Sequence, residues 1–347
     1  MKNALLQLAA KDGMSGFEFS LTEVVSNLLA PYCASVERDP MGNVVGVIPA
    51  KNPDAKSVML EAHIDGIGLM VSGISEEGFL SFVPVGGVDS AILPGAEVRV
   101  WGKEVLYGVI GAKPPHLQTG GQDKATAIKD MYIDLGLCGE VVRQKVSVGD
   151  MVCFAEEPAA LCNDVFSGKS FDDRAGLISL LLCLENLKGK ELPFTIYVVA
   201  AVQEEVGLRG ATMVSERLSP DCAFVVDVCH GDTPDAGSES IFKLGSGAVI
   251  SFGPNIHPYL SSLAKEVAEK ENIAASFDAD GGDTGTDAWA VQVANGGIPV
   301  LLLSIPLRYM HTTVETLHFD DVQAVGDLLA AILQNLDLEV LACTFQN

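Results

Sequence analysis

Basic residues are scarce in this sequence. Its 347 residues include 22 Lys and Arg against 46 Asp and Glu, which gives a formal net charge of -24 at pH 7. Nucleic-acid phosphates and anionic membrane surfaces both attract clusters of Lys and Arg, so we expect no nucleic-acid partner and no membrane partner. The negative field favours basic or neutral peptides as ligands.

Long apolar stretches and paired cysteines are also missing. No apolar run reaches the ~20 residues that cross a bilayer, and the first residues lack the apolar core and cleavage site of a signal peptide. The eight cysteines form no Cys-x-x-Cys pair, and several, such as Cys183, lie inside apolar runs. Cysteines of this kind act as small buried apolar residues, and they indicate a reducing compartment. We therefore expect a soluble cytoplasmic protein.

Motifs for covalent catalysis and nucleotide binding are absent as well. The sequence holds no Gly-x-Ser-x-Gly elbow, and no cysteine lies in a nucleophile motif. The glycine-rich segments 245–247 and 281–285 match neither a P-loop nor a dinucleotide fingerprint. Aromatic residues make up 6% of the chain and include two Trp, which argues against a sugar cleft lined by aromatic platforms.

The sequence does contain alternating strand and helix patterns at both ends of the chain. Between them, from 68 to 163, short β-like runs alternate with Gly and Pro, and no convincing long helix is present. That texture is typical of a small barrel or sandwich. We therefore predict an α/β domain formed by 1–67 and 164–347, with a mixed sheet covered by helices, and an inserted all-β domain formed by 68–163.

Individual elements follow from the apolar periodicity and from the Gly and Pro breakers. The Gly- and Pro-rich segment 113–127, which contains His116, is expected to be a loop. The expected helices are 2–11, 20–30, 173–187, 207–215, 257–270 and 320–336. The expected strands include 35–38, 43–48, 57–65, 194–202, 223–228, 247–251 and 299–304.

Glu204 and Glu205 form the most informative pair in the chain. They end the apolar run 194–203, which is predicted to be a buried strand. A buried carboxylate destabilises the fold by several kcal/mol unless a cation or a hydrogen-bond network meets it. A metal site would resolve this conflict, with one carboxylate binding the ion and its neighbour transferring protons.

Other candidate ligands lie where further strands are expected to end. In an open α/β sheet, ligands bind at the carboxyl ends of the strands, so these residues are expected to meet there. His and carboxylate side chains together suit zinc, cobalt or manganese. The candidates are His63, Asp65, Asp172, Asp227 and His311.

Each candidate also has a purely structural alternative. His63 could be a hydrogen-bonded loop residue, and Asp172 could be only the N-cap of the helix that follows it. Asp227 could satisfy loop amides, and Glu204 and Glu205 could lie at the exposed rim of the sheet. Five separate strand ends would then carry acids or His by coincidence, which favours the metal site.

Six segments of the chain resemble the glutamyl-aminopeptidase and tetrahedral-aminopeptidase family of metallopeptidases, some of whose members have been labelled endoglucanases. The segments occur in the family's order and span nearly the whole chain. The most specific ones are Val202–Ala211, which reads Val-Gln-Glu-Glu-Val-Gly-Leu-Arg-Gly-Ala, and Arg308–His311. The others are Ala62–Asp65, Ser170–Arg174, Val226-Asp227 with Gly231–Pro234, and Gly285–Ala288.

The resemblance implies a role for each candidate residue. Two metal ions, zinc or cobalt, would be bridged by Asp172. His63 and Asp227 would complete one site, and Glu205 and His311 the other. Glu204 would be the general base, Asp65 would orient His63, and Asp173 would bind no metal. The implied function is removal of the N-terminal residue of peptides, by dimers that contact through the β domain and assemble into a dodecamer.

One residue departs from the family pattern, because Gly66 stands where the family usually has Glu after His-x-Asp. Three other functions remain open at this point. A glycoside hydrolase would use two carboxylates across a sugar. An N-acyl amino acid deacylase could use the same metal site. A metal-stabilised scaffold without activity is the third, although such a site needs no unliganded base like Glu204 beside the metal.

Overall fold

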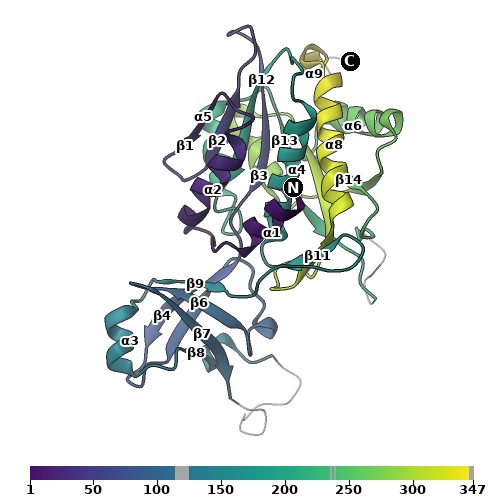
Figure 1. Cartoon of the computed structure of the whole chain (residues 1–347). Coiled ribbons are helices and arrows are strands. Elements are labelled where there is room, and N and C mark those ends of the chain that lie inside the picture. Colours follow the sequence, from purple (N-terminus) through teal and green to yellow (C-terminus); the bar gives the residue numbers. More distant parts are fainter. Residues whose placement is uncertain (114–124, 235–236, 238–239, 344–347) are drawn as a thin grey trace.

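The computed structural model describes residues 1–113, 125–234, 237 and 240–343. It contains an 11-stranded mixed sheet flanked by helices and, apart from it, a closed antiparallel barrel. Figure 1 shows the barrel projecting from one end of the larger, sheet-containing part. The predicted fold, an α/β sheet with a small all-β module, is confirmed. Most of the predicted loop 113–127, including His116, lies outside the described residues.

The helices and strands have the following bounds. The helices are α1 (Lys2–Ala10), α2 (Phe19–Leu29), α3 (Gly139–Lys145), α4 (Phe171–Asn186), α5 (Arg209–Leu218), α6 (Pro258–Glu271), α7 (Asp287–Val293), α8 (Phe319–Asn335) and α9 (Leu338–Cys343). The strands of the large sheet are β1 (Ser35–Arg38), β2 (Val44–Ile48), β3 (Ser57–His63), β10 (Ala159–Ala160), β11 (Val165–Gly168), β12 (Thr195–Ala201), β13 (Cys222–His230), β14 (Ala248–Phe252), β15 (Ala275–Ala279), β16 (Val300–Arg308) and β17 (Glu315–His318). The barrel strands are β4 (Gly68–Ile74), β5 (Leu80–Val85), β6 (Glu97–Trp101), β7 (Val105–Ala112), β8 (Met131–Asp134) and β9 (Met151–Phe154).

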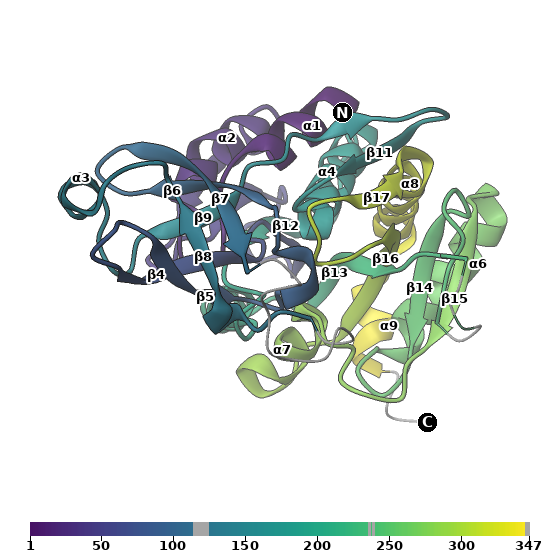
Figure 2. The ribbon, with the colours of Figure 1, turned by 90° about the horizontal axis from the view of Figure 1, so that it is seen from below.

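The centre of the large sheet consists of four parallel strands in the order β12, β3, β13 and β16. Their side chains are almost all buried, because helices cover both faces of the sheet. Figure 2 shows α4 and α8 on one face and α7 on the other. Parallel strands place their carboxyl ends at one edge, so the residues that follow β12, β3 and β16 are brought together there.

The barrel is held together by alternation of side chains along its strands. In β6 and β7 every second residue faces inward, and the buried core includes Val98, Val100 and Ile110. The short helix α3 lies in this part of the chain, where the sequence had predicted no convincing long helix. The domain boundaries near 67 and 163 stay a prediction, while the barrel strands themselves run from Gly68 to Phe154.

Asp12 joins the barrel to the N-terminal segment of the sheet-containing part. Its carboxylate accepts hydrogen bonds from Nε of Arg99 at 2.9 Å and from Nε1 of Trp101 at 2.7 Å, both on β6. The fully buried guanidinium of Arg174 in α4 donates to the carbonyls of Leu8, Lys11, Gly13 and Ile64. The segment between α1 and α2 is therefore fixed against both the barrel and the end of β3.

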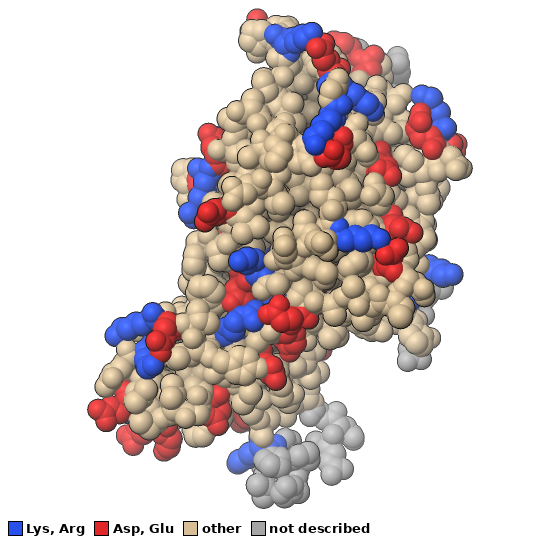
Figure 3. Space-filling view, viewed as in Figure 1, with Lys and Arg blue, Asp and Glu red and all other residues tan. Residues whose placement is uncertain are grey.

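Charged side chains of both signs share the molecular surface. On the face shown in Figure 3 most blue side chains have a red neighbour, and carboxylates gather on the barrel at the lower left. Among the described residues, no helix is both long enough and apolar enough to cross a membrane.

Candidate metal centre

Two groups of His and carboxylate side chains meet at the carboxyl edge of the central strands. One group is His63, Asp172 and Asp227, and the other is Asp172, Glu205 and His311. Within each group the potential ligand atoms all lie within 4.8 Å of one another. Asp172 belongs to both groups, so the structure brings all five predicted ligands into one site.

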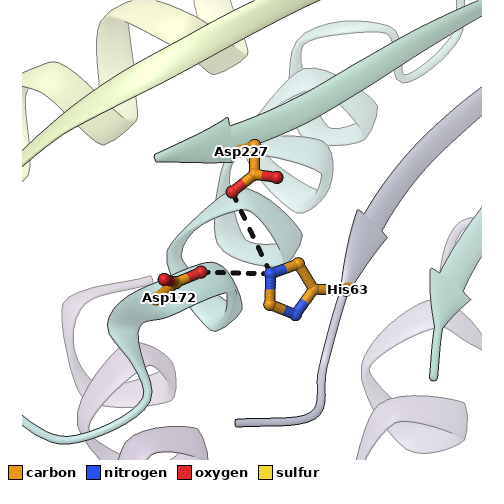
Figure 4. Close-up of side chains that lie close together, drawn as sticks. All are labelled: His63, Asp172 and Asp227. Atoms are coloured by element: carbon orange, nitrogen blue, oxygen red, sulfur yellow. Dashed lines mark hydrogen bonds and ion pairs between the residues drawn. The ribbon is translucent and has the colours of Figure 1, made fainter. Parts of the chain in front are cut away.

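Asp172 faces the two groups with different oxygens. Its Oδ1 lies 3.0 Å from Nε2 of His63, which in turn lies 3.9 Å from Oδ1 of Asp227 (Figure 4). Its Oδ2 lies 3.3 Å from Nε2 of His311, and Oε2 of Glu205 lies 3.2 Å from the same nitrogen. A carboxylate placed in this way can bridge two cations, because each of its oxygens can bind one ion.

The local backbone explains why these side chains converge. His63 ends β3, and Asp227 lies within β13 rather than at its end as the sequence had suggested. Asp172 and Asp173 have non-helical backbone angles, so the regular part of α4 starts only after them and neither is a simple N-cap. Asp172 thereby faces the ring of His63 across the site, as Figure 4 shows.

Glu204 and Glu205 both reach the site because β12 has already ended at Ala201. Consecutive residues of a strand would face opposite sides of the sheet. Here Gln203 has a φ of +58°, and the chain turns before the two glutamates. His311 also has a positive φ, +59°, and follows β16 after only two intervening residues, since that strand extends to Arg308 instead of ending near 304.

Asp65 organises the site without belonging to either group. It is fully buried, and its Oδ1 lies 3.6 Å from Nδ1 of His63. The same carboxylate accepts hydrogen bonds from the backbone amides of Glu204 at 3.1 Å and Glu205 at 3.3 Å, and from the hydroxyl of Ser15 at 2.5 Å. Asp65 thus holds the backbone of the turn that carries both glutamates and lies beside the ring of His63.

Glu204 lies beside the two groups and is a member of neither. Its Oε2 is 3.9 Å from Nε2 of His63. Burial, together with the negative charge of Asp227, raises the pKa of Glu204 to about 10 when no metal is present. A nearby cation would lower that pKa, because an opposite charge favours the ionised carboxylate.

The pKa values of the candidate ligands indicate that the described residues of the site lack a compensating positive charge. Burial raises the pKa of Asp227 to about 7 and raises that of Glu205. Hydrogen bonds with Asp172 and Glu205 raise the pKa of His311 to about 11. Within the part of the chain that the structure describes, no Lys or Arg forms an ion pair with the five residues of the two groups. Two imidazoles and three carboxylates match the nitrogen and oxygen donors that divalent transition metals take, so the residues fit a metal centre.

Sequence analysis missed two buried carboxylates that hold the site's backbone. Glu315 accepts hydrogen bonds from the backbone amides of Phe171, Asp172 and His311 at 2.7, 3.2 and 3.1 Å. Glu18 accepts hydrogen bonds from the amides of Gly16 at 2.7 Å and Gln203 at 3.1 Å. The contacts of Glu315 with Phe171 and Asp172, and that of Glu18 with Gln203, join segments more than 140 positions apart, so no local motif could have identified these roles.

Further carboxylates lie behind the metal site. Glu61, Asp173 and Asp287 are almost wholly buried, and burial raises the pKa of each well above its ordinary value. Asp287 belongs to one of the segments that resemble the family, although no role follows for it from the sequence. None of the three belongs to the two candidate groups.

Gly66 allows close approach of the segment that carries Asp172. A Cβ atom added at Gly66 would lie 2.8 Å from Oγ of Ser170. The glutamate usual at this position would therefore require Ser170 to move. The loss of that carboxylate leaves both candidate groups intact.

A cavity of about 710 Å³ opens on the two groups. Asp172, Glu204, Glu205, Asp227 and His311 all line it, whereas His63 lies behind them. The barrel reaches the same place, because Gly87, in the loop after β5, also lines the cavity and packs against His311. A ligand in this cavity would contact the candidate base and both groups.

The sequence matches the family model described as M42 glutamyl aminopeptidase over residues 42–328. That range includes the five candidate ligands, Glu204 and Asp65. This chain belongs to the M42 glutamyl aminopeptidase family. The membership confirms the predicted family, and the chain is a metal-dependent aminopeptidase, a hydrolase of peptides.

Individual M42 relatives support this assignment over nearly their full lengths. The lysyl aminopeptidase of Pyrococcus furiosus is 34% identical over 330 residues, which cover 93% of this chain and 94% of that protein. The structure of a TET aminopeptidase from a marine sediment archaeon, Thaumarchaeota archaeon SCGC AB-539-E09, is 32% identical with a TM-score of 0.91 and covers 98% of both chains. The Pyrococcus horikoshii TET1 peptidase, which can assemble into a tetrahedron or a large octahedral shell, is 31% identical with a TM-score of 0.83 and covers 96% of this chain and 98% of its own.

Proposed function

We propose that this M42 aminopeptidase uses two divalent metal ions and that the two groups around Asp172 hold them. His63 and Asp227 complete one ion's ligands, and Glu205 and His311 complete the other's. The observation that carries this proposal is the arrangement of Asp172, whose two oxygens face His63 and His311 separately. The donor set favours zinc or cobalt.

Glu204 is the proton-transfer residue in this proposal. When bound, the ions would polarise the scissile carbonyl and lower the pKa of the attacking water. Glu204 removes a proton from that water and returns it to the leaving amine, a role for which it lies close to His63 but outside both groups. Asp65 fixes the backbone amide of Glu204 and thereby the place from which the carboxylate acts.

The cavity suits a peptide with a free N-terminus. Among the described residues that line it there are seven carboxylates and no Lys or Arg, namely Asp172, Glu204, Glu205, Asp227, Asp278, Asp280 and Asp283. Asp278, Asp280 and Asp283 are not proposed ligands, so their charge remains when metal is bound; it favours a protonated terminal amine and repels a C-terminal carboxylate. The preference for the amino end of a peptide follows from that asymmetry.

We further propose a cytoplasmic homo-oligomer in which the barrels of two subunits meet. Tyr107 and Val109 on β7 and Tyr132 on β8 expose 56%, 43% and 44% of their surface, although they are large and apolar. Such patches favour protein contacts. The assembly of the Pyrococcus horikoshii relative supports a shell, and light scattering that gives the mass of a dodecamer would test it.

The cysteines that the structure describes are free, which favours a reducing compartment.

Two rival activities can be separated from this proposal by one experiment. The purified protein is incubated with aminoacyl-nitroanilides, N-acyl amino acids and carboxymethylcellulose, with and without a chelator followed by zinc or cobalt. Metal-dependent release of nitroaniline is expected. Chelator-resistant cleavage of cellulose would favour a glycoside hydrolase, although Trp289 is the sole aromatic residue among the described residues that line the cavity. Hydrolysis of acylated substrates alone would favour a deacylase.

A further inference from the structure

A row of polar side chains crosses four adjacent strands on the floor of the cavity. The strands are β13, β16, β14 and β15, in that spatial order. Asp227 is paired with Ser304, Ser304 with Val249, and Ser251, two residues after Val249, with Asp278. Paired residues and residues two apart share a face of a sheet, so all the polar members point the same way.

The row leads away from the proposed metal site. Asp227, Ser304, Ser251 and Asp278 all line the cavity. Three strand spacings separate the first from the last, about 14 Å between backbones. One end of the row therefore lies at the proposed metal site, and the other lies across the floor of the cavity from it.

The serines in the middle of the row are almost wholly buried and line the cavity. Ser251 and Ser304 are each only 3% exposed. In the described ranges of the chain, neither hydroxyl has a hydrogen-bond partner. Because both serines line the cavity, their hydroxyls are free to bond to a bound molecule or to water there.

Asp278 ends the row with a negative charge that no cation neutralises. Its Oδ1 accepts a hydrogen bond from the hydroxyl of Ser240 at 3.0 Å. Over the residues that the structure describes, no Lys or Arg lies within ion-pair distance of its carboxylate. Leu302, Ala279 and Met310 also line the cavity and offer apolar surface to an aliphatic chain. A passage with apolar side chains along part of its wall and a carboxylate at its end matches the stem and the charged head of a lysine or arginine.

We propose that Asp278 selects peptides whose N-terminal residue is lysine or arginine. This inference rests on the aminopeptidase function proposed above, and it adds the residue that reads the substrate side chain. Charge-assisted hydrogen bonds to one oxygen of Asp278 and polar contacts along Ser251 would hold the cation. A neutral side chain of equal length would gain the apolar contacts alone.

The test compares lysyl-, arginyl-, leucyl- and glutamyl-nitroanilide as substrates of the metal-loaded oligomer. The wild-type protein is expected to have its highest kcat/KM for the two basic substrates. Asp278→Asn should lower the ratio of kcat/KM for lysyl over leucyl substrate by roughly 10- to 100-fold. Asp278→Glu should retain most of the ratio, and Asp278→Lys should move the preference toward glutamyl substrate.

Asp54→Asn is the matched control, because Asp54 is exposed in the loop between β2 and β3 and does not line the cavity. It removes the same charge and should leave the ratio unchanged. A wild-type preference for leucyl or glutamyl substrate, or an unchanged ratio in Asp278→Asn, would overturn the role of Asp278 while leaving the aminopeptidase function intact. Failure to hydrolyse any of the four substrates with zinc or cobalt would instead count against the proposed function itself.

Discussion

The carboxylate of Asp65 holds the backbone of Glu204, whose amide donates to Oδ1 of Asp65 at 3.1 Å. The same oxygen lies 3.6 Å from Nδ1 of His63, so one buried side chain links a proposed ligand to the proposed base. The two carboxylates beside His63 also change the pKa of its buried imidazole. Burial lowers its pKa, but Asp172 and Asp65 together raise that pKa well above its ordinary value.

Asp65→Asn should therefore impair both metal binding and turnover. The amide cannot accept from both backbone donors and also face His63 as an anion, so we expect a loss of roughly 10- to 100-fold in metal affinity or kcat. Metal competition with a chelating dye and steady-state kinetics would measure the two effects. Ser15→Ala is the control, because it removes one hydrogen bond but keeps the charge of Asp65. Wild-type affinity and kcat in Asp65→Asn would show that this residue does not position the site.

Glu204→Gln and Glu205→Gln form a matched pair of adjacent substitutions. If Glu204 transfers protons, its glutamine variant keeps both metal ions and loses roughly 100- to 10,000-fold in kcat. If Glu205 is a ligand, its glutamine variant loses metal as well as activity. Metal analysis of each dialysed variant beside its kcat distinguishes the two roles. An active Glu204→Gln variant would show that the base has been misassigned.

Glu18 makes stability depend on pH. Burial and the negative charge of Asp65 raise its pKa from 4.5 to about 7 in the folded protein. The folded state thus binds this proton more tightly than the unfolded state does. The stabilisation it gives is complete below pH 4.5 and is lost as the pH rises through about 7.

Glu18→Gln should flatten this part of the pH profile, because the amide oxygen can still accept from Gly16 and Gln203 but binds no proton. Urea unfolding of the chelated protein at pH 5 and pH 8 measures the change in the free energy of unfolding between the two pH values. Glu18→Ala leaves two backbone donors without their acceptor and should lower kcat about tenfold. An equal pH slope in wild type and Glu18→Gln would rule out Glu18 as its source.

Metal binding should release protons and strengthen as the pH rises. Asp172 and Glu205 raise the pKa of His311 to about 11, and His63 is raised as well, so both imidazoles are protonated near neutral pH without metal. An ion must displace these protons before it can bind nitrogen. We expect the apparent affinity to fall at least about tenfold per pH unit between pH 8 and pH 6. Calorimetry in buffers of different ionisation enthalpy counts the protons, and an affinity independent of pH would contradict these ionisation states.

The sequence was sufficient to predict the architecture and the convergence of the candidate residues. Apolar runs such as the one before Glu204 identified buried strands, and the structure shows that the central ones are parallel, so that their carboxyl ends share an edge. The residues at those ends then had to meet. Asp227 lies beside His63 and Asp172, as expected, although it lies inside β13, because the strand is longer than its apolar core.

The supporting residues could not be predicted in this way. Glu315 lies 143 positions from Asp172, and Glu18 lies 185 positions from Gln203, so each contact depends on how distant loops pack. The non-helical start of α4 was missed for a related reason. An Asp before a helix is by default an N-cap, whereas Glu315 holds the amides of Phe171 and Asp172 and keeps this turn open.

The most direct test of a two-metal centre is the metal stoichiometry of activity. Chelated protein is titrated with zinc or cobalt while hydrolysis of an aminoacyl-nitroanilide and bound metal per chain are followed together. We expect no activity without metal and full activity at two ions per chain, with both ions lost from the Asp172→Ala variant. Full activity after complete chelation, or at one ion per chain with Glu205 and His311 replaced by alanine, would contradict the proposed dinuclear centre.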